Sequence, residues 1–316
     1  MARPRGSATT LPTGRARRSR RITVTWAVVP GPHGAVRVRW YEPVVPAVSD
    51  ASPPLIWVHG GGFVAGGLWH PESFATGRAL ARAGVPVMSV GYRLVKGATL
   101  LTEPSPKRLE SGVRYPIPLD DVLAAIASVG DRHYLLGGAS AGACLAAAAT
   151  LKMLRIGGNV PEAVFLAYGT FHAVLPEPSA ELAATLHQGV GRVHFREDNV
   201  FNMNLGYAGS RERMRDPFVF PGGHDLTGFP PTFLLDADRD SLRASGEAFA
   251  AELRAAGVAV DHRIVPGTLH GFLARTWMPA YRTGIATVIG WALRAERASV
   301  MRAPIPDEHP DGHPPR

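Results

Sequence analysis

The sequence of 316 residues contains only one cysteine, Cys144. An intrachain disulfide bond is therefore excluded, which fits a reducing cytoplasm. Long hydrophobic runs are also missing, because no stretch approaches the roughly 18 consecutive apolar residues that a membrane-spanning helix needs. Apolar residues make up 46% and charged residues 19% of the chain, which is ordinary for a globular protein. We therefore expect a soluble cytoplasmic protein without a membrane span.

Acidic residues are absent from residues 1–21, and this arm carries most of the positive charge. The net charge of the chain is +8, of which seven charges come from Arg3, Arg5, Arg15, Arg17, Arg18, Arg20 and Arg21. The rest of the chain is close to neutral, so we expect no nucleic acid binding by the core. An arm of this composition cannot bury enough apolar surface to fold, which predicts disorder. An anionic partner and a twin-arginine export signal stay open as weaker alternatives.

The apolar pattern of the remaining chain predicts strands that alternate with helices. Ile22 to Val29 and Ala35 to Tyr41 alternate around a turn rich in Pro and Gly and predict a hairpin. Buried parallel strands are predicted at Leu55 to Val58, Val85 to Val90, Tyr134 to Leu136, Val164 to Tyr168, Thr232 to Leu235 and Val258 to Val265. Helices are predicted at Pro118 to Val129, Ala141 to Leu154, Ser241 to Ala256 and about Pro279 to Arg297. This order predicts an α/β fold, with a mostly parallel sheet covered by helices on both faces.

The length and the pattern favour one catalytic domain, residues 22–300, followed by a disordered tail at residues 301–316. Two stretches interrupt the alternation of strands and helices. One is a long polar loop, Val95 to Tyr115, and the other is an insertion at about residues 171–215. Long insertions in compact domains often serve as lids or binding loops. We expect the second insertion to form a small cap.

The segment Gly138-Ala139-Ser140-Ala141-Gly142 lies between a predicted strand and an Ala-rich helix. This is the context in which the pattern G-x-S-x-G forms a nucleophile elbow. Glycines two positions before and after the serine let the backbone turn sharply, which leaves the hydroxyl at a helix N-terminus. Ser140 is therefore the candidate nucleophile. The alternative is that Ser140 only caps the helix.

The segment His59-Gly60-Gly61-Gly62-Phe63 follows directly after the strand predicted at Leu55 to Val58. Successive glycines allow backbone N–H groups to point at a ligand. Acyl transfer needs such donors, because negative charge develops on the carbonyl oxygen. The chain contains neither G-x-x-x-x-G-K-[ST] nor G-x-G-x-x-G, so a phosphate-binding loop is not indicated.

Six ordered segments together resemble the hormone-sensitive-lipase-like branch of the α/β-hydrolase esterases, over about residues 22–295. They are the two segments above and Tyr92-Arg93-Leu94, Pro116 through Asp120-Asp121-Val122, Asp216-Pro217 leading to Gly228-Phe229-Pro230-Pro231, and His270-Gly271-Phe272. The resemblance implies an α/β-hydrolase fold, ester hydrolysis without a metal or organic cofactor, and an oxyanion hole formed by Gly61, Gly62 and Ala141. The chain departs from the family at Ala139, where an acidic residue is common. We also expect the arginine-rich arm to stand in place of the helical N-terminal extension that forms much of the family's cap.

Three aspartates, Asp236, Asp238 and Asp240, follow the strand predicted at Thr232 to Leu235. Similar enzymes place the catalytic acid in a D-P-L-R-x-x-G-E run, and residues 240–247 match this run in all but the proline. The resemblance therefore implies Asp240, with Asp236 or Asp238 as the alternative. Among the twelve histidines, His270 is the candidate base, because it follows the last strand in the order Ser, Asp, His that is typical of this fold.

The sequence thus predicts a serine hydrolase that cleaves carboxylic esters, with the catalytic residues Ser140, His270 and Asp240 and a small-molecule ester as substrate. Two other hypotheses remain. The same residues could act on an amide such as an arylformamide, or transfer the acyl group to an alcohol. The chain could also be a catalytically silent receptor for a small molecule, because a fold alone does not determine function.

Overall fold

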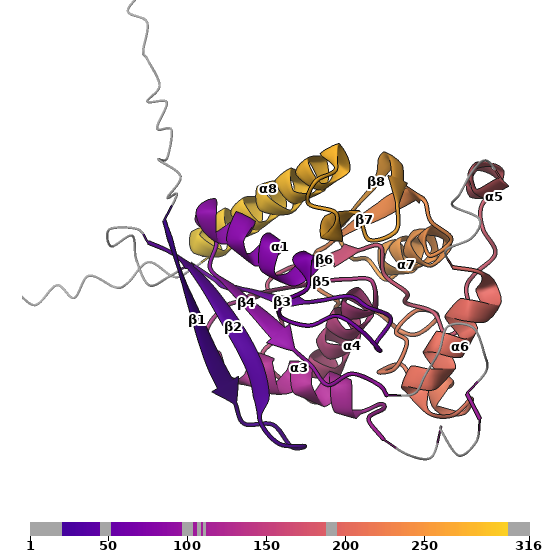
Figure 1. The fold of residues 1–316 in the computed structure, drawn as a ribbon, viewed down its shortest axis with the longest axis horizontal. Helices are drawn as coiled ribbons and strands as arrows, with labels where there is room; N and C mark the ends of the chain where they lie inside the picture. The colour runs from indigo at the N-terminus through magenta and orange to yellow at the C-terminus, as the bar shows by residue number, and fades with distance from the viewer. Residues whose placement is uncertain are drawn as a thin grey trace, which may run out of the picture.

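The computed structural model describes residues 21–44, 52–96, 104–105, 109, 112–187 and 195–302. Its centre is an eight-stranded sheet with the order β1-β2-β4-β3-β5-β6-β7-β8 (Figure 1). β1 and β2 form an antiparallel hairpin, β2 pairs with β4 in the antiparallel sense, and the other pairs are parallel. The strands are β1 (Ile22–Val29), β2 (Val36–Pro43), β3 (Leu55–Val58), β4 (Val87–Gly91), β5 (Leu135–Ala139), β6 (Val164–Ala167), β7 (Thr232–Arg239) and β8 (Val260–Leu269).

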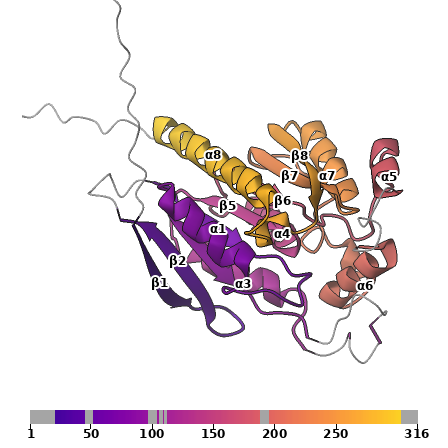
Figure 2. The same cartoon turned by 45° about the horizontal axis from the view of Figure 1, so that its top comes forward.

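Helices cover both faces of this sheet, as Figures 1 and 2 show from two directions. On one face lie α1 and α8, and on the other lie α3, α4 and α7, as the two clusters of buried apolar side chains show. The described helices are α1 (Pro71–Arg82), α3 (Ile117–Ala127), α4 (Ala141–Ile156), α5 (Ala180–His187), α6 (Glu197–Ala208), α7 (Arg243–Ala255) and α8 (Pro279–Arg302), with the short 3-10 turns η2 (Arg213–Arg215) and η3 (Phe272–Ala274).

The strand periodicity explains why there are two apolar clusters. Along β3, Leu55 and Trp57 belong to the cluster under α1 and α8, whereas Ile56 and Val58 belong to the opposite cluster. Successive side chains of a strand point to opposite faces. A strand that is buried on both faces therefore needs a continuous apolar run, and all four residues of β3 are buried.

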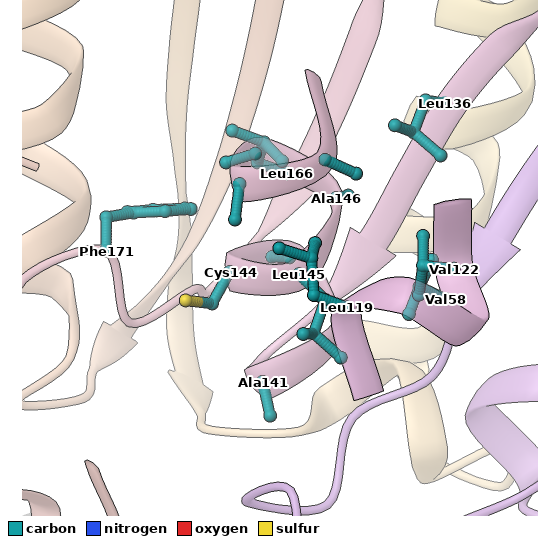
Figure 3. Packing of buried hydrophobic residues seen from close by; sticks show 14 of the residues in the cluster. Val58, Leu119, Val122, Leu136, Ala141, Cys144, Leu145, Ala146, Leu166 and Phe171 are labelled. Atoms are coloured by element: carbon teal, nitrogen blue, oxygen red, sulfur yellow. The ribbon is translucent and has the colours of Figure 1, made fainter. Parts of the chain in front are cut away.

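Helix α4 packs against the middle of the sheet, directly after Ser140. Its first eleven residues are all buried. Figure 3 shows part of this packing, with Leu145 of α4 beside Leu119 of α3. Burial raises the pKa of the Cys144 thiol well above its usual range, so this cysteine is not activated as a nucleophile.

The predicted α/β fold, the opening hairpin and the predicted strands and helices are confirmed, with shifts at several ends. β8 extends to Leu269, four residues beyond its predicted end, and α8 extends to Arg302. The structure also bounds helix α1, which the sequence pattern had not delimited. Residues 1–20 of the arm, most of the polar loop between Val95 and Tyr115, and residues 303–316 lie outside the described residues.

The predicted cap segment, about residues 171–215, contains α5, α6 and η2 between β6 and β7. Residues 188–194 of this segment lie outside the described residues. In both views α5 and α6 lie beside α7, on the opposite side of the molecule from the β1–β2 hairpin (Figures 1 and 2). That this segment closes over a substrate stays a prediction.

None of the helices in the described part of the chain is long and apolar enough to cross a membrane.

Two helical glycines provide a test of the packing between α1 and the hairpin. A Cβ on Gly77 of α1 would lie 2.6 Å from ring atoms of Tyr41, whereas a Cβ on Gly290 of α8 would meet only the tip of Arg294 at 3.4 Å. We expect Gly77→Ala to lower the free energy of unfolding by about 1–3 kcal/mol through overpacking. We expect Gly290→Ala to raise it by up to about 1 kcal/mol, because alanine favours the helix. Urea unfolding of both variants measures this, and equal effects would contradict the close approach of α1 to β2.

Candidate active site

Ser140 lies in the sharp turn between β5 and α4, with φ 54° and ψ −124°. A non-glycine residue with positive φ is strained, and such strain is typical of functional turns. The turn is possible because of its two glycines. A Cβ on Gly138 would lie 2.3 Å from the carbonyl oxygen of Gly142, and a Cβ on Gly142 would lie 2.2 Å from that of Val58. The predicted nucleophile elbow is therefore present as a backbone conformation.

The structure brings Ser140, His270 and Asp240 together from the ends of three strands. His270 Nε2 lies 2.9 Å from Ser140 Oγ, and His270 Nδ1 lies 2.6 Å from Asp240 Oδ2. The second carboxylate oxygen of Asp240 accepts a hydrogen bond from the N–H of Leu242 at 3.1 Å. Ser140 and Asp240 are buried. A hydroxyl, an imidazole and a buried carboxylate thus form a continuous hydrogen-bonded chain.

The two other aspartates of β7 have different partners. Asp236 lies 2.8 Å from Nε2 of His262, and burial raises the pKa of this carboxyl above its usual value although His262 acts against the shift. Asp238 accepts a hydrogen bond from the N–H of Gly267 at 2.7 Å and lies 3.5 Å from Arg243. Neither carboxylate is hydrogen-bonded to His270 among the described contacts, so the geometry favours Asp240 over the two alternatives.

The glycine loop runs beside the elbow. Gly61 and Gly62 have φ values of +120° and +60°, a range that favours glycine. Among the described residues, the N–H groups of Gly61, Gly62 and Ala141 have no acceptor within hydrogen-bonding distance. Their N–H groups are therefore available to a ligand.

A buried glutamate, Glu72 at the start of α1, is hydrogen-bonded to the backbone of this loop. Its Oε2 accepts a hydrogen bond from the N–H of Gly60 at 2.7 Å, and its Oε1 accepts one from the hydroxyl of Tyr168 at 2.6 Å. The ring of Tyr168 in turn packs edge-on against His270, with centroids 5.0 Å apart. Glu72 and Tyr168 thus connect the loop with the imidazole, and sequence reasoning missed both. Neither residue belongs to a motif. Only the folded structure reveals them, because it shows that the Glu72 carboxyl group is buried and that Tyr168 bonds to it.

Two further contacts fix His270. The ring of Phe195 lies 4.5 Å away, between centroids, in an edge-on arrangement. Arg275 donates a hydrogen bond to the carbonyl oxygen of His270 at 2.7 Å. Phe195, which comes from the predicted cap segment, thus contacts the imidazole itself, whereas Arg275 holds the backbone of His270.

The cap segment also contacts the glycine loop. A Cβ on Gly62 would lie 2.9 Å from the sulfur of Met203 in α6. A pocket of about 170 Å³ lies between the segment and the residues that follow Asp240, and Leu175, Leu186, Ser241 and Ala244 contribute to its lining. The described part of the chain contains no cluster of three or more His, Cys, Asp or Glu side chains that could hold a metal ion.

The profile of the alpha/beta hydrolase fold family matches residues 106–274. The chain is 32% identical over 254 residues to carboxylesterase NlhH of Mycobacterium tuberculosis, with 75% of this chain and 71% of the relative covered. It is 29% identical over 268 residues to an acetyl esterase of Salmonella paratyphi B, with 80% and 74% covered. Among solved structures, a brefeldin A esterase described as a bacterial homologue of human hormone sensitive lipase matches with a TM-score of 0.74 and 25% identity, covering 93% of this chain and 81% of that chain.

The chain therefore belongs to the alpha/beta hydrolase fold family. Within that family it is a carboxylesterase-type hydrolase of the hormone-sensitive-lipase-like branch. The resemblance that the six sequence segments indicated is confirmed.

His59, the first residue of the glycine loop, is buried and stacks on Tyr92 with ring centroids 4.3 Å apart. Its Nδ1 donates a hydrogen bond to the carbonyl oxygen of Gly60 at 2.7 Å. Burial lowers the pKa of His59 from 6.5 to about 4, with the bond to Gly60 acting against the shift. The imidazole is therefore neutral at pH 7, which suits a residue that shapes the loop.

The lowered pKa of His59 predicts a loss of stability in acid. Between pH 6.5 and about 4 the unfolded chain binds a proton at this position and the folded chain does not. The contribution of His59 to the free energy of unfolding is therefore complete above pH 6.5 and falls as the pH drops. The loss amounts to about 3 kcal/mol. We expect the difference in unfolding free energy between wild type and His59→Gln to shrink by about this amount from pH 7 to pH 4.5, measured by urea unfolding. An unchanged difference would contradict a buried neutral His59.

Proposed function

We propose that this enzyme hydrolyses carboxylic esters through an acyl-serine intermediate, with Ser140 as nucleophile, His270 as general base and Asp240 as the acid that orients it. The observation that carries the proposal is the pair of contacts at His270, 2.9 Å to Ser140 Oγ and 2.6 Å to Asp240 Oδ2. A nucleophile and a base within hydrogen-bonding reach, with the base oriented by a third group, is the arrangement that activates a serine.

In the first step Ser140 Oγ attacks the ester carbonyl carbon, and His270 Nε2 accepts the hydroxyl proton. Asp240 holds Nδ1–H of the imidazole and stabilises the imidazolium that forms. The carbonyl oxygen becomes an oxyanion, which the N–H groups of Gly61, Gly62 and Ala141 stabilise. The N-terminus of α4 adds a favourable dipole at the same place.

The tetrahedral intermediate then collapses. The bond between the carbonyl carbon and the alkoxy oxygen breaks, and His270 returns the proton to the departing alcohol. A water molecule gives a proton to His270 and attacks the acyl-serine, and the second collapse releases the carboxylic acid and returns the proton to Ser140. These steps require no metal and no organic cofactor.

The substrate class is a small-molecule carboxylic ester. The names of the relatives, a carboxylesterase and an acetyl esterase, support an ester as the scissile group. An amide such as an arylformamide, and transfer of the acyl group to an alcohol, use the same three residues and remain the second candidates. A panel of aryl esters, amides and lactones separates them by rate.

Substitution of the three residues tests the mechanism. We expect Ser140→Ala, His270→Ala and Asp240→Asn each to reduce the kcat/KM for a small aryl ester by about 10³-fold or more. The double variants should be strongly non-additive, because the three residues act as one unit. Steady-state kinetics on purified, folded variants measures this.

The neighbouring aspartate supplies the matched control. Asp238→Asn should have a much smaller effect on turnover, since this carboxylate bonds to Gly267 rather than to His270. A severe loss in Asp238→Asn together with a nearly normal Asp240→Asn would mean that the acid is wrongly assigned. A silent receptor would leave Ser140 unlabelled by a fluorophosphonate, whereas the proposal predicts covalent labelling that Ser140→Ala abolishes.

The oxyanion donors are tested at Gly62. A valine at this position meets both a φ of +60° and the sulfur of Met203, so it displaces the loop N–H groups. We expect Gly62→Val to lower kcat by roughly 10²–10³-fold, the loss typical of one donor, while the circular-dichroism spectrum stays native. Gly223→Val, which has a similar φ of +80° but open space around it, is the control and should keep its kcat. Normal turnover in a folded Gly62→Val variant would remove Gly62 from the oxyanion hole.

A further inference from the structure

A second, larger cavity lies beside the β1–β2 hairpin. It has a volume of about 620 Å³, and its lining includes Trp26, Arg37, Trp69, His70, Arg93 and Lys96. This volume lies in the range of small-molecule sites. None of Ser140, Asp240, His270, Gly61 and Gly62 belongs to its described lining. The hairpin lies on the side of the molecule opposite α5 and α6 (Figures 1 and 2).

The described lining of this cavity contains basic side chains and no acidic ones. Arg37 and Lys96 are exposed, and neither forms an ion pair with a described carboxylate. Arg93 is different, because it pairs with the buried Asp121 and donates its backbone N–H to the same carboxylate. Two cations therefore face the cavity without a partner from the described residues.

Two tryptophans form an apolar wall next to these cations. Trp26 and Trp69 are 47% and 70% exposed, and their ring centroids lie 5.3 Å apart. Large exposed aromatic side chains that cluster in this way often mark a binding surface. The two rings, which are tilted by 45° to each other, therefore offer exposed apolar area beside positive charge.

A buried arginine lies behind the tryptophan wall. The guanidinium of Arg39 lies 4.6 Å from the ring centroid of Trp26 and 4.4 Å from that of Trp69. Arg39 is only 8% exposed, and its Nε and Nη1 atoms have no hydrogen-bond acceptor among the described residues. The aromatic faces stabilise this cation, but no described carboxylate neutralises it. Its charge adds to the positive potential of the cavity.

We propose that this cavity is a binding site for an organic anion with a flat apolar body, such as an aromatic carboxylate, separate from the ester site. The apolar body packs against the exposed sides of Trp26 and Trp69, which removes exposed ring area from water. The anionic group lies against Arg37 and Lys96, and charged hydrogen bonds of this type are stronger than neutral ones. An acidic side chain would oppose such a ligand, and the described lining supplies none.

The cavity shares a wall with the glycine loop. Its lining includes Tyr92, whose hydroxyl donates a hydrogen bond to the carbonyl oxygen of His59 at 3.0 Å. It also includes Gly66, where a Cβ would lie 2.4 Å from the carbonyl oxygen of Gly60. The two sites are therefore neighbours in the fold, although binding at the cavity does not depend on the ester chemistry.

The test is a calorimetric titration of the full-length Ser140→Ala protein with 2-naphthoate, and with the neutral 2-naphthamide as matched ligand. We expect 2-naphthoate to bind more tightly than the amide, and its affinity to fall when NaCl is raised from 50 to 500 mM, because salt screens exposed charges. Reversal of both cations in Arg37→Glu/Lys96→Glu should weaken 2-naphthoate about ten-fold and leave 2-naphthamide nearly unchanged. Trp69→Ala should weaken both ligands about five- to ten-fold.

Two variants elsewhere on the surface are the controls. Arg254→Glu reverses an exposed charge on α7, and Trp277→Ala removes a tryptophan that is 77% exposed. Neither should change the affinity for 2-naphthoate. The proposal is overturned if 2-naphthoate and its amide bind equally, or if Arg37→Glu/Lys96→Glu and Trp69→Ala bind 2-naphthoate like the unsubstituted protein. The readout is independent of turnover, so it stands apart from the success or failure of the proposed ester hydrolysis.

Discussion

The close backbone contact between the glycine loop and the nucleophile elbow is the constraint on which the rest of the site depends. A Cβ on Gly142 would lie within 2.4 Å of the carbonyl oxygens of both Val58 and His59. A Cβ on Gly60 would lie 3.0 Å from the Cβ atom of Ser140. No side chain fits between the two segments. The distance from the serine hydroxyl to the free N–H groups of the loop is thus set by main-chain packing between β3, β5 and α4, which is far stiffer than a contact between side chains. A site for charge stabilisation needs this stiffness, because donors that are already in place cost no reorganisation when the charge develops.

Most of the fold could be predicted from the sequence, because a buried parallel strand and a hairpin strand leave different apolar patterns. All four residues of β3 and of β6 are buried and apolar, so the runs mark the strands directly. Prediction was weaker where burial is partial. β8 alternates between half-buried and exposed residues from Val260 to Ile264, and the exposed Pro266 and Gly267 interrupt the apolar pattern just after the predicted end of the strand. Glu72 and Tyr168 could not be found at all, since their meaning lies in a hydrogen bond between residues 96 positions apart.

The three aspartates near the end of β7 show a different limit, since Asp236 and Asp238 lie in the strand and Asp240 directly follows it. Their spacing of two is the period of a strand, so spacing alone cannot distinguish them, and the choice of Asp240 came from its resemblance to a family motif. The structure gives each carboxylate its own partner: His262 for Asp236, Gly267 for Asp238 and His270 for Asp240. These partners lie on β8 or on the turn that follows it. The pairing of β7 with β8, including the register shift between Ala237 and Arg239, therefore assigns the carboxylates. That register is a property of the folded sheet rather than of any local segment.

The electrostatics of the proposed oxyanion site rest on the backbone. The first turn of α4 contains no acidic residue, and position 139, which is often acidic in similar enzymes, holds a buried alanine. The positive end of the helix dipole is therefore not offset by a carboxylate on its own helix. His59 is neutral at pH 7, because burial lowers its pKa to about 4, so it adds no charge to the loop. A carboxyl group does reach this region from Glu72, but it bonds to Gly60, and the N–H groups of Gly61 and Gly62 stay without an acceptor among the described residues. The glutamate thus anchors the loop through Gly60, which is not one of the donors of the proposed oxyanion hole.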